Sequence, residues 1–103
     1  PGGYDHCYVL TREGSGLSLA AELFEPKSGR RMTVATTEPG LQFYSGNFLD
    51  GSQSSGSDVF NQHGAICLEA QHFPDAVNQA AFPSVILRPG QTYRQTTVHT
   101  FSW

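Results

Sequence analysis

The sequence predicts an all-β fold, and two observations carry the prediction. No stretch of the 103 residues repeats apolar side chains at helical spacing over several turns. Short runs of β-branched and aromatic residues instead alternate with clusters of Gly, Pro, Asn and Ser along the whole chain. Hydrophobic residues make up 38% of the chain and charged residues 15%, which is enough apolar material for one modest core and argues against disorder. The length fits one small domain or a piece of a larger one.

The predicted strands follow one another from the first residues to the last. They are 7–10, 17–25, 31–36, 41–45, 65–71, 85–87 and 92–101. Between the second and third strands, Pro26 fixes φ and Gly29 permits a positive φ, as a tight connection requires. We therefore expect these two strands to pair antiparallel. The motifs Glu38-Pro39-Gly40 and Arg88-Pro89-Gly90 supply the same turn chemistry later in the chain.

Two longer segments, 46–64 and 72–84, lack strand patterning. The first contains the Ser- and Gly-rich tract 51–57, which is typical of a surface loop. The second is the better candidate for a functional loop, because long ordered loops in small domains often carry function. Neither segment has the carboxylate density of a calcium-binding loop, and the histidines show no metal-ligand spacing. No metal site is predicted.

Alternation along two strands predicts a polar sheet face. Successive side chains of a strand point to opposite sides, so Cys67, Glu69 and Gln71 share one face of strand 65–71. In strand 41–45, Gln42 and Tyr44 share a face in the same way. Carboxylate, amide and phenol groups together suit a ligand dense in hydroxyls, such as a sugar, since each hydroxyl both donates and accepts. Antiparallel sheets also commonly keep one solvated face, and alternation alone favours that simpler interpretation.

Composition argues against several classes of function. Six Lys and Arg against nine Asp and Glu give a net charge of −3, and the basic residues form no stripe that could follow phosphates. No apolar run reaches bilayer length, and no hydrolase, P-loop or dinucleotide motif is present. We predict no nucleic-acid partner and no membrane partner. Cys7 and Cys67 lie outside any CxxC spacing, so free buried thiols are expected, and a cytoplasmic location with them.

Several longer motifs are more specific than alternation. They are Gly3-Tyr4-Asp5-His6, Ser28-Gly29-Arg30, the segments 36–48 and 67–76, Phe82-Pro83-Ser84 and Leu87-Arg88-Pro89-Gly90. In this order they resemble the C-terminal portion of the aldose 1-epimerase (galactose mutarotase) family. Members of that family are antiparallel β-sandwiches longer than this chain, so the resemblance implies that residues 1–103 form the C-terminal portion of one such sandwich. The chain also begins without an initiator Met, and we expect it to be a piece of a longer protein.

The resemblance implies an enzyme that interconverts the α and β anomers of free hexoses such as galactose and glucose, without a cofactor. It assigns the catalytic base to Glu69, and it assigns the binding of sugar hydroxyls to Asp5 and Gln42. The base takes the proton of the anomeric hydroxyl while an acid protonates the ring oxygen. In the family this acid is a His that lies well upstream of the matched portion, and His6 is expected to be structural. The monosaccharide and the remainder of the same β-sandwich are the implied partners.

Two other hypotheses stay open at this point. A non-catalytic carbohydrate-binding β-module would carry the same polar face without needing an acid. A glycosidase would need a second carboxylate across the scissile bond, for which Asp5 is the candidate. In isolation, the uncovered sheet edges and inner face are expected to leave the chain aggregation-prone or only marginally folded.

Overall fold

The computed structural model of the chain describes residues 2–12 and 14–103. In chain order its elements are β1 (Asp5–Val9), β2 (Ser18–Glu25), β3 (Arg30–Thr36), β4 (Gly40–Tyr44), β5 (Ser54–Ser55), β6 (Asp58–Val59), β7 (Cys67–Gln71), the 3₁₀ helix η1 (Ala76–Asn78) and β8 (Thr97–Ser102). Every described strand pair is antiparallel. The predicted all-β class is confirmed. In the described part of the chain, no helix has the length and apolar character needed to cross a membrane.

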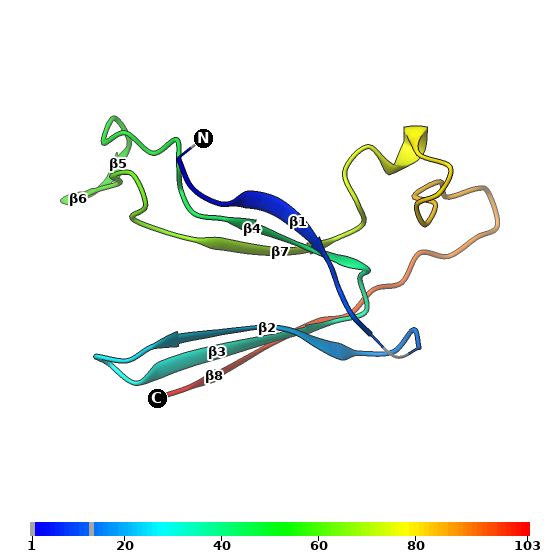
Figure 1. Cartoon of the computed structure of the whole chain (residues 1–103), viewed down its shortest axis with the longest axis horizontal. Helices are drawn as coiled ribbons and strands as arrows, with labels where there is room; N and C mark the ends of the chain where they lie inside the picture. Colours follow the sequence, from blue (N-terminus) through cyan, green and yellow to red (C-terminus); the bar gives the residue numbers. More distant parts are fainter. Residues whose placement is uncertain (1, 13) are drawn as a thin grey trace.

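The strands form two three-stranded sheets that lie one above the other as two layers (Figure 1). One sheet has the order β1-β4-β7 and the other the order β2-β3-β8, while β5 and β6 form a separate small hairpin. A cavity of about 330 Å³ between the layers is lined by side chains from both sheets, among them Leu23 from β2 and Leu41, Phe43 and Leu68 from β4 and β7. Two antiparallel sheets that face each other across apolar side chains make up the predicted β-sandwich architecture.

The β2–β3 hairpin forms as the turn residues predict. The Gly29 amide donates to the Glu25 carbonyl over 2.9 Å, and Gly29 takes a φ of 74° that its missing Cβ makes inexpensive. The Glu25 carboxylate accepts the amides of Lys27 and Ser28 at 2.9 and 2.7 Å. The side-chain hydrogen bond of Ser28, followed by these bonds from the two backbone amides, holds the pKa of Glu25 below its usual value.

The chain crosses from one sheet to the other between β3 and β4, and Arg12 braces this crossover. Its Nη1 atom donates to the carbonyls of Thr37 and Glu38, and its Nη2 atom donates to the carbonyl of Gly16. The amide of Leu10 donates to the carbonyl of Pro39 over 3.0 Å. Because one guanidinium ties three carbonyls from two segments, the start of β4 is fixed relative to the end of β1.

The buried core is small. Among the described residues, the buried apolar ones are Val34, Leu41 and Ala76, and Val34 is completely inaccessible to solvent. Thr36 is equally buried, and its hydroxyl lies 2.9 Å from that of Thr97 in the neighbouring strand β8. Many large apolar side chains stay exposed, Leu19 and Phe101 among them. The two layers therefore leave much apolar surface uncovered.

Several details differ from the prediction, and the first strand, for instance, covers Asp5–Val9 rather than 7–10. Residues 85–87 form no strand, although they are apolar and β-branched, because no neighbouring strand pairs with them. The last strand covers only residues 97–102, since its partner β3 ends where Thr36 pairs with Thr97. The Ser- and Gly-rich tract, expected to be a loop, contains β5 and a turn at Gly56 with a φ of 59°, after which β6 pairs with β5 in a short hairpin.

Candidate functional site

The polar face predicted from alternation exists and extends over all three strands of the β1-β4-β7 sheet. Gln42 pairs with Glu69 on one side and with Cys7 on the other. Paired residues of antiparallel strands point to the same side, so these three side chains form one row across the sheet. The flanking positions Leu41 and Leu68 point the opposite way, into the cavity between the sheets. The polar row therefore lies on the side that the second sheet does not cover.

Asp5 joins this row through a hydrogen bond. The Gln42 side-chain amide donates to the Asp5 carboxylate over 2.8 Å. Asp5 and Glu69 are exposed, whereas Gln42 is half-buried. The other Gln42 side-chain atom, Oε1, is shielded from solvent and has no hydrogen-bond partner among the described residues. The structure thus brings together Asp5, Gln42 and Glu69, and leaves an acceptor unsatisfied beside two exposed carboxylates.

A polar cluster behind Asp5, formed by Gly3, Tyr4, Ser45 and Asn47, holds this end of the site. The Tyr4 amide donates to Ser45 Oγ, and Asn47 Nδ2 donates to the Tyr4 carbonyl, both over 2.9 Å. Ser45 Oγ lies 2.6 Å from Asn47 Oδ1. Asn47 is only 5% exposed, so these partners satisfy a buried amide. Gly3 is required for the approach, because a Cβ there would stand 2.5 Å from Ser45 Oγ.

Sequence reasoning did not identify this supporting cluster. Its members belong to two motifs more than forty residues apart, and their contact arises only because β1 pairs with β4. Small polar side chains directly after a strand were the one available signal. They are equally typical of a turn that bonds its own backbone, so the pattern alone does not point to a long-range contact.

The histidines lie away from the polar row. His6 pairs with Phe43, which places it on the face opposite Glu69. His63 Nδ1 lies 2.9 Å from the Ser45 carbonyl oxygen, and His99 is in β8 of the other sheet. Among residues 2–12 and 14–103, no group of three or more His, Cys, Asp or Glu side chains is placed to hold a metal ion.

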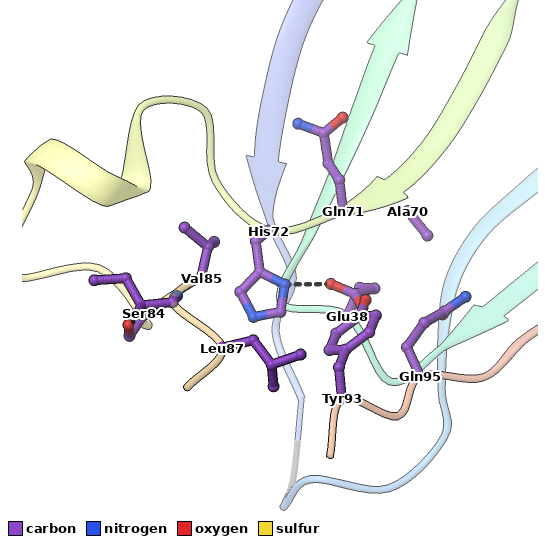
Figure 2. A pocket seen from close by; sticks show the side chains of 10 residues that line it. Glu38, Ala70, Gln71, His72, Ser84, Val85, Leu87, Tyr93 and Gln95 are labelled. Carbon is purple, nitrogen blue, oxygen red and sulfur yellow. Dashed lines mark hydrogen bonds and ion pairs between the residues drawn. The ribbon is translucent and has the colours of Figure 1, made fainter. Parts of the chain in front are cut away.

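A second polar cluster, which the sequence did not reveal, surrounds Glu38 (Figure 2). This carboxylate is 3% exposed. Its Oε1 accepts the hydroxyl of Tyr93 over 2.5 Å, and its Oε2 lies 2.6 Å from His72 Nδ1, an ion pair when the imidazole is protonated. The hydrogen bond to Glu38, with burial and the negative charge as smaller causes, raises the pKa of Tyr93. The cluster joins the turn before β4, the residue after β7 and the segment before β8.

The cluster forms the floor of a cavity of about 530 Å³. The remainder is lined by the apolar side chains of residues 85–87 and Ala70 and by the polar side chains of Gln71, Ser84 and Gln95. In Figure 2 the imidazole of His72 points one nitrogen toward Glu38, and Leu87 lines the same cavity. Since Gln71 also belongs to the polar face, the cavity adjoins one end of that face.

The prediction for the two cysteines has a mixed outcome. Both cysteines are free thiols, as expected, but Cys67 is exposed rather than buried, and Cys7 is half-buried. Partial burial raises the pKa of Cys7, which the hydrogen bond from Gln71 opposes only in part. In the segment 72–84, Asp75 bonds the side chains of Asn78 and Gln79, and these hydrogen bonds lower its pKa.

Comparison with known proteins matches these features to one family. The sequence model described as aldose 1-epimerase matches residues 1–100. The chain is 46% identical over 101 residues to the galactose mutarotases of Rattus norvegicus and Homo sapiens, which is 97% of this chain and 29% of each relative. It is 38% identical over 101 residues to the aldose 1-epimerase of Escherichia coli (strain K12), again 29% of that relative.

The chain therefore spans less than a third of the length of these curated relatives. The match nevertheless covers nearly all of the chain and includes every motif that suggested the resemblance. The predicted resemblance is confirmed, and the chain belongs to the aldose 1-epimerase family.

Proposed function

We propose that this chain is the C-terminal portion, residues 1–103, of a single β-sandwich that catalyses the interconversion of the α and β anomers of free hexoses such as galactose and glucose. The observation that carries the proposal is the row of side chains on the open face of the β1-β4-β7 sheet. Glu69 and Gln42 are direct cross-strand partners, and Gln42 binds Asp5 over 2.8 Å. The names of the relatives, galactose mutarotase and aldose 1-epimerase, support the same activity.

In the proposed reaction Glu69 is the general base. Its exposed carboxylate takes the proton of the anomeric hydroxyl while an acid gives a proton to the ring oxygen, so the bond between that oxygen and C1 breaks. The free aldehyde then rotates about its bond to C2. Either face of the carbonyl is attacked when the ring closes, and the two protons return to their donors. In some turnovers the configuration at C1 is inverted. No reagent is consumed, so the reaction needs no cofactor.

Asp5 and Gln42 hold the hydroxyls of the sugar in this proposal. A carboxylate accepts hydrogen bonds from two hydroxyls, and the Asp5 carboxylate is exposed on this face beside the side-chain amide of Gln42. A ligand with many hydroxyls fits this arrangement better than an apolar one.

The acid is proposed to come from the upstream part of the sandwich. None of the described histidines shares the face of Glu69 within its row, since His6 points to the opposite side and His72 contacts Glu38. The same observation supports the alternative of a carbohydrate-binding module without catalysis. The two functions differ in one measurable quantity, which is the rate at which α-galactose reaches anomeric equilibrium.

The test is polarimetry of freshly dissolved α-D-galactose with the natural protein, whose intact mass is measured on the same sample. We expect the rotation to relax faster than in buffer, and Glu69→Gln to lower kcat by at least about 10²-fold, the lower range for one general acid or base. The Arg31→Gln variant is the matched control, because Arg31 lies in the other sheet, paired with Glu22. If the Glu69→Gln variant accelerates mutarotation as the unmodified protein does, the assignment of the base is refuted. If the unmodified protein binds galactose without accelerating mutarotation, the carbohydrate-binding module is the function that remains.

A further inference from the structure

The loop that follows β7 returns an aromatic ring to the polar face. Gly40 follows the alternation of β4, so a Cβ built on it points to the same side as Gln42. That Cβ would lie 3.0 Å from Phe73 Cε1, 3.1 Å from Phe73 Cδ1 and 3.0 Å from Cys7 Sγ. The phenyl ring and the thiol therefore meet above Gly40, on the face that carries the candidate base.

The ring occupies the end of the face opposite Asp5. Along β4 the positions on this side are Gly40, Gln42 and Tyr44, and Tyr44 pairs with Asp5. Same-face neighbours of a strand lie about 7 Å apart, so Phe73 is one step from the row of Gln42 and Glu69. Along the strand direction, the row of Cys7, Gln42 and Glu69 thus lies between the carboxylate of Asp5 on one side and the ring of Phe73 on the other.

The position of the ring is fixed by its neighbours. Phe73 is half-buried, and Phe82 packs on it edge to face with ring centroids 5.2 Å apart. Gln71, the cross-strand partner of Gly40, reaches over to Cys7 Sγ at 3.8 Å and fills the space beside them. Because position 40 has no side chain, the ring can lie directly on the backbone of β4. A residue larger than glycine there would displace it.

We propose that Phe73 is a further substrate-contacting residue, whose ring packs against the C–H groups of the sugar held by Asp5 and Gln42. A hexose carries apolar C–H groups as well as hydroxyls, and ligand sites combine apolar and aromatic walls with a few placed polar groups. The described polar face has its hydroxyl-binding groups at one end, so the opposite end is where an apolar wall contributes to binding. The proposal rests on the proposed function for the identity of the ligand, and it adds a residue to that site.

The kinetic test uses the natural protein with Phe73→Ala, Phe73→Leu and Phe73→Tyr. The ring contacts sugar before and during the reaction alike, so its loss affects binding and leaves the proton transfers intact. We expect Phe73→Ala to raise KM for galactose about tenfold with kcat within about twofold, and Phe73→Tyr to keep KM within about twofold. Phe24→Ala is the matched control, because Phe24 is an exposed phenyl of β2 in the other sheet. An unchanged KM for Phe73→Ala, with unchanged unfolding midpoint, overturns the proposal.

Two further measurements keep the test decisive. If Phe73→Ala fails to fold, Phe73→Leu retains bulk without the aromatic ring, and an unchanged KM for that variant overturns the proposal equally. Alkylation of Cys7 gives a readout that does not depend on activity. The thiol should react faster in Phe73→Ala, and galactose should slow the reaction where the same concentration of sorbitol does not. If galactose does not slow the alkylation of Cys7 in Phe73→Ala, this result counts against a sugar bound beside the position of the ring.

The two proposals fail in different ways. A protein that accelerates mutarotation while Phe73→Ala keeps its KM refutes the aromatic wall alone. A protein that binds galactose without accelerating mutarotation refutes the proposed reaction, and the wall is then judged from the Kd of the same variants.

Discussion

Replacing Gly3 by alanine tests whether the polar cluster of Gly3, Tyr4, Ser45 and Asn47 holds Asp5 in place. The added Cβ would stand 2.5 Å from Ser45 Oγ and 3.0 Å from His63 Cε1, and it would overlap Asn47 Oδ1. No positive φ is needed at Gly3, so the effect is steric alone. Asn47 is 95% enclosed and has no space in which to swing away, so Tyr4 must lose its hydrogen bonds to the cluster.

The magnitude follows from two contributions. Overpacking a tight site costs about 1–3 kcal/mol, and each hydrogen bond lost from the cluster costs about 0.5–1.5 kcal/mol. The added Cβ would break two hydrogen bonds, the one from the Tyr4 backbone amide to Ser45 Oγ and the one from Asn47 Nδ2 to the Tyr4 carbonyl. We expect Gly3→Ala to destabilise the protein by about 2–6 kcal/mol in total. Displacement of the neighbouring Asp5 should also raise KM for galactose.

The matched control is Gly16→Ala. Position 16 has no heavy atom within 4 Å of a built Cβ and no positive φ, so the same chemical change meets neither clash nor strain. Its expected effect lies between none and a stabilisation of about 1 kcal/mol, through the smaller entropy of the unfolded chain. Urea unfolding of the natural protein, followed by circular dichroism, gives the two free energies. Equal unfolding midpoints for Gly3→Ala and Gly16→Ala would show that the cluster accommodates the added Cβ without loss of stability. The steric argument would then be refuted.

Three other predictions follow from single contacts. Gly29→Ala should cost about 1–2 kcal/mol of unfolding free energy in a urea titration, purely from its φ of 74°, because nothing lies within 4 Å of the added Cβ. The pKa of Tyr93 is raised in the folded protein by its bond to Glu38, so its contribution to stability is complete below the unfolded pKa of about 10 and is lost as pH rises through the higher folded value. The stability gap between the unmodified protein and Tyr93→Phe should accordingly be larger at pH 8 than at pH 11, and an equal gap would contradict the contact. Iodoacetamide should modify the exposed Cys67 before the half-buried Cys7, whose pKa is raised by burial; mass spectrometry of tryptic peptides decides the order.

The alternation of side chains predicted which residues of one strand share the polar face. It did not predict which strands lie next to each other. The period of two places Gln42 and Glu69 opposite Leu41 and Leu68 regardless of which strands are neighbours, and the structure agrees. Asp5 lies beside Gln42 because β1 pairs with β4, and these two residues are 37 positions apart in the sequence. Local sequence carries no information about that pairing, so the resemblance to the family supplied Asp5 where the residue pattern did not.

The features that the sequence predicted wrongly or missed have a similar origin. Residues 85–87 have the composition of a strand, but a strand also needs a neighbour with free backbone groups, and the described sheets offer none there. The cluster around Glu38 joins three segments that are each a turn or an extended connection in the sequence. A glutamate followed by Pro-Gly predicts a solvated turn, and only the fold shows that the carboxylate is 3% exposed.

Core and candidate site are built on the same strands, and this ties the function to the register. Leu41 and Leu68 line the cavity between the sheets, while the residues that follow them, Gln42 and Glu69, face the other side. A slip of one residue would exchange the two sets and place a carboxylate in the apolar layer. The contacts of Arg12 with the crossover before β4, and those of Asn47 after it, oppose such a slip from both ends of the strand. The polar groups at the strand ends therefore do more than stabilise turns, because they determine which side chains lie on the open face of the sheet.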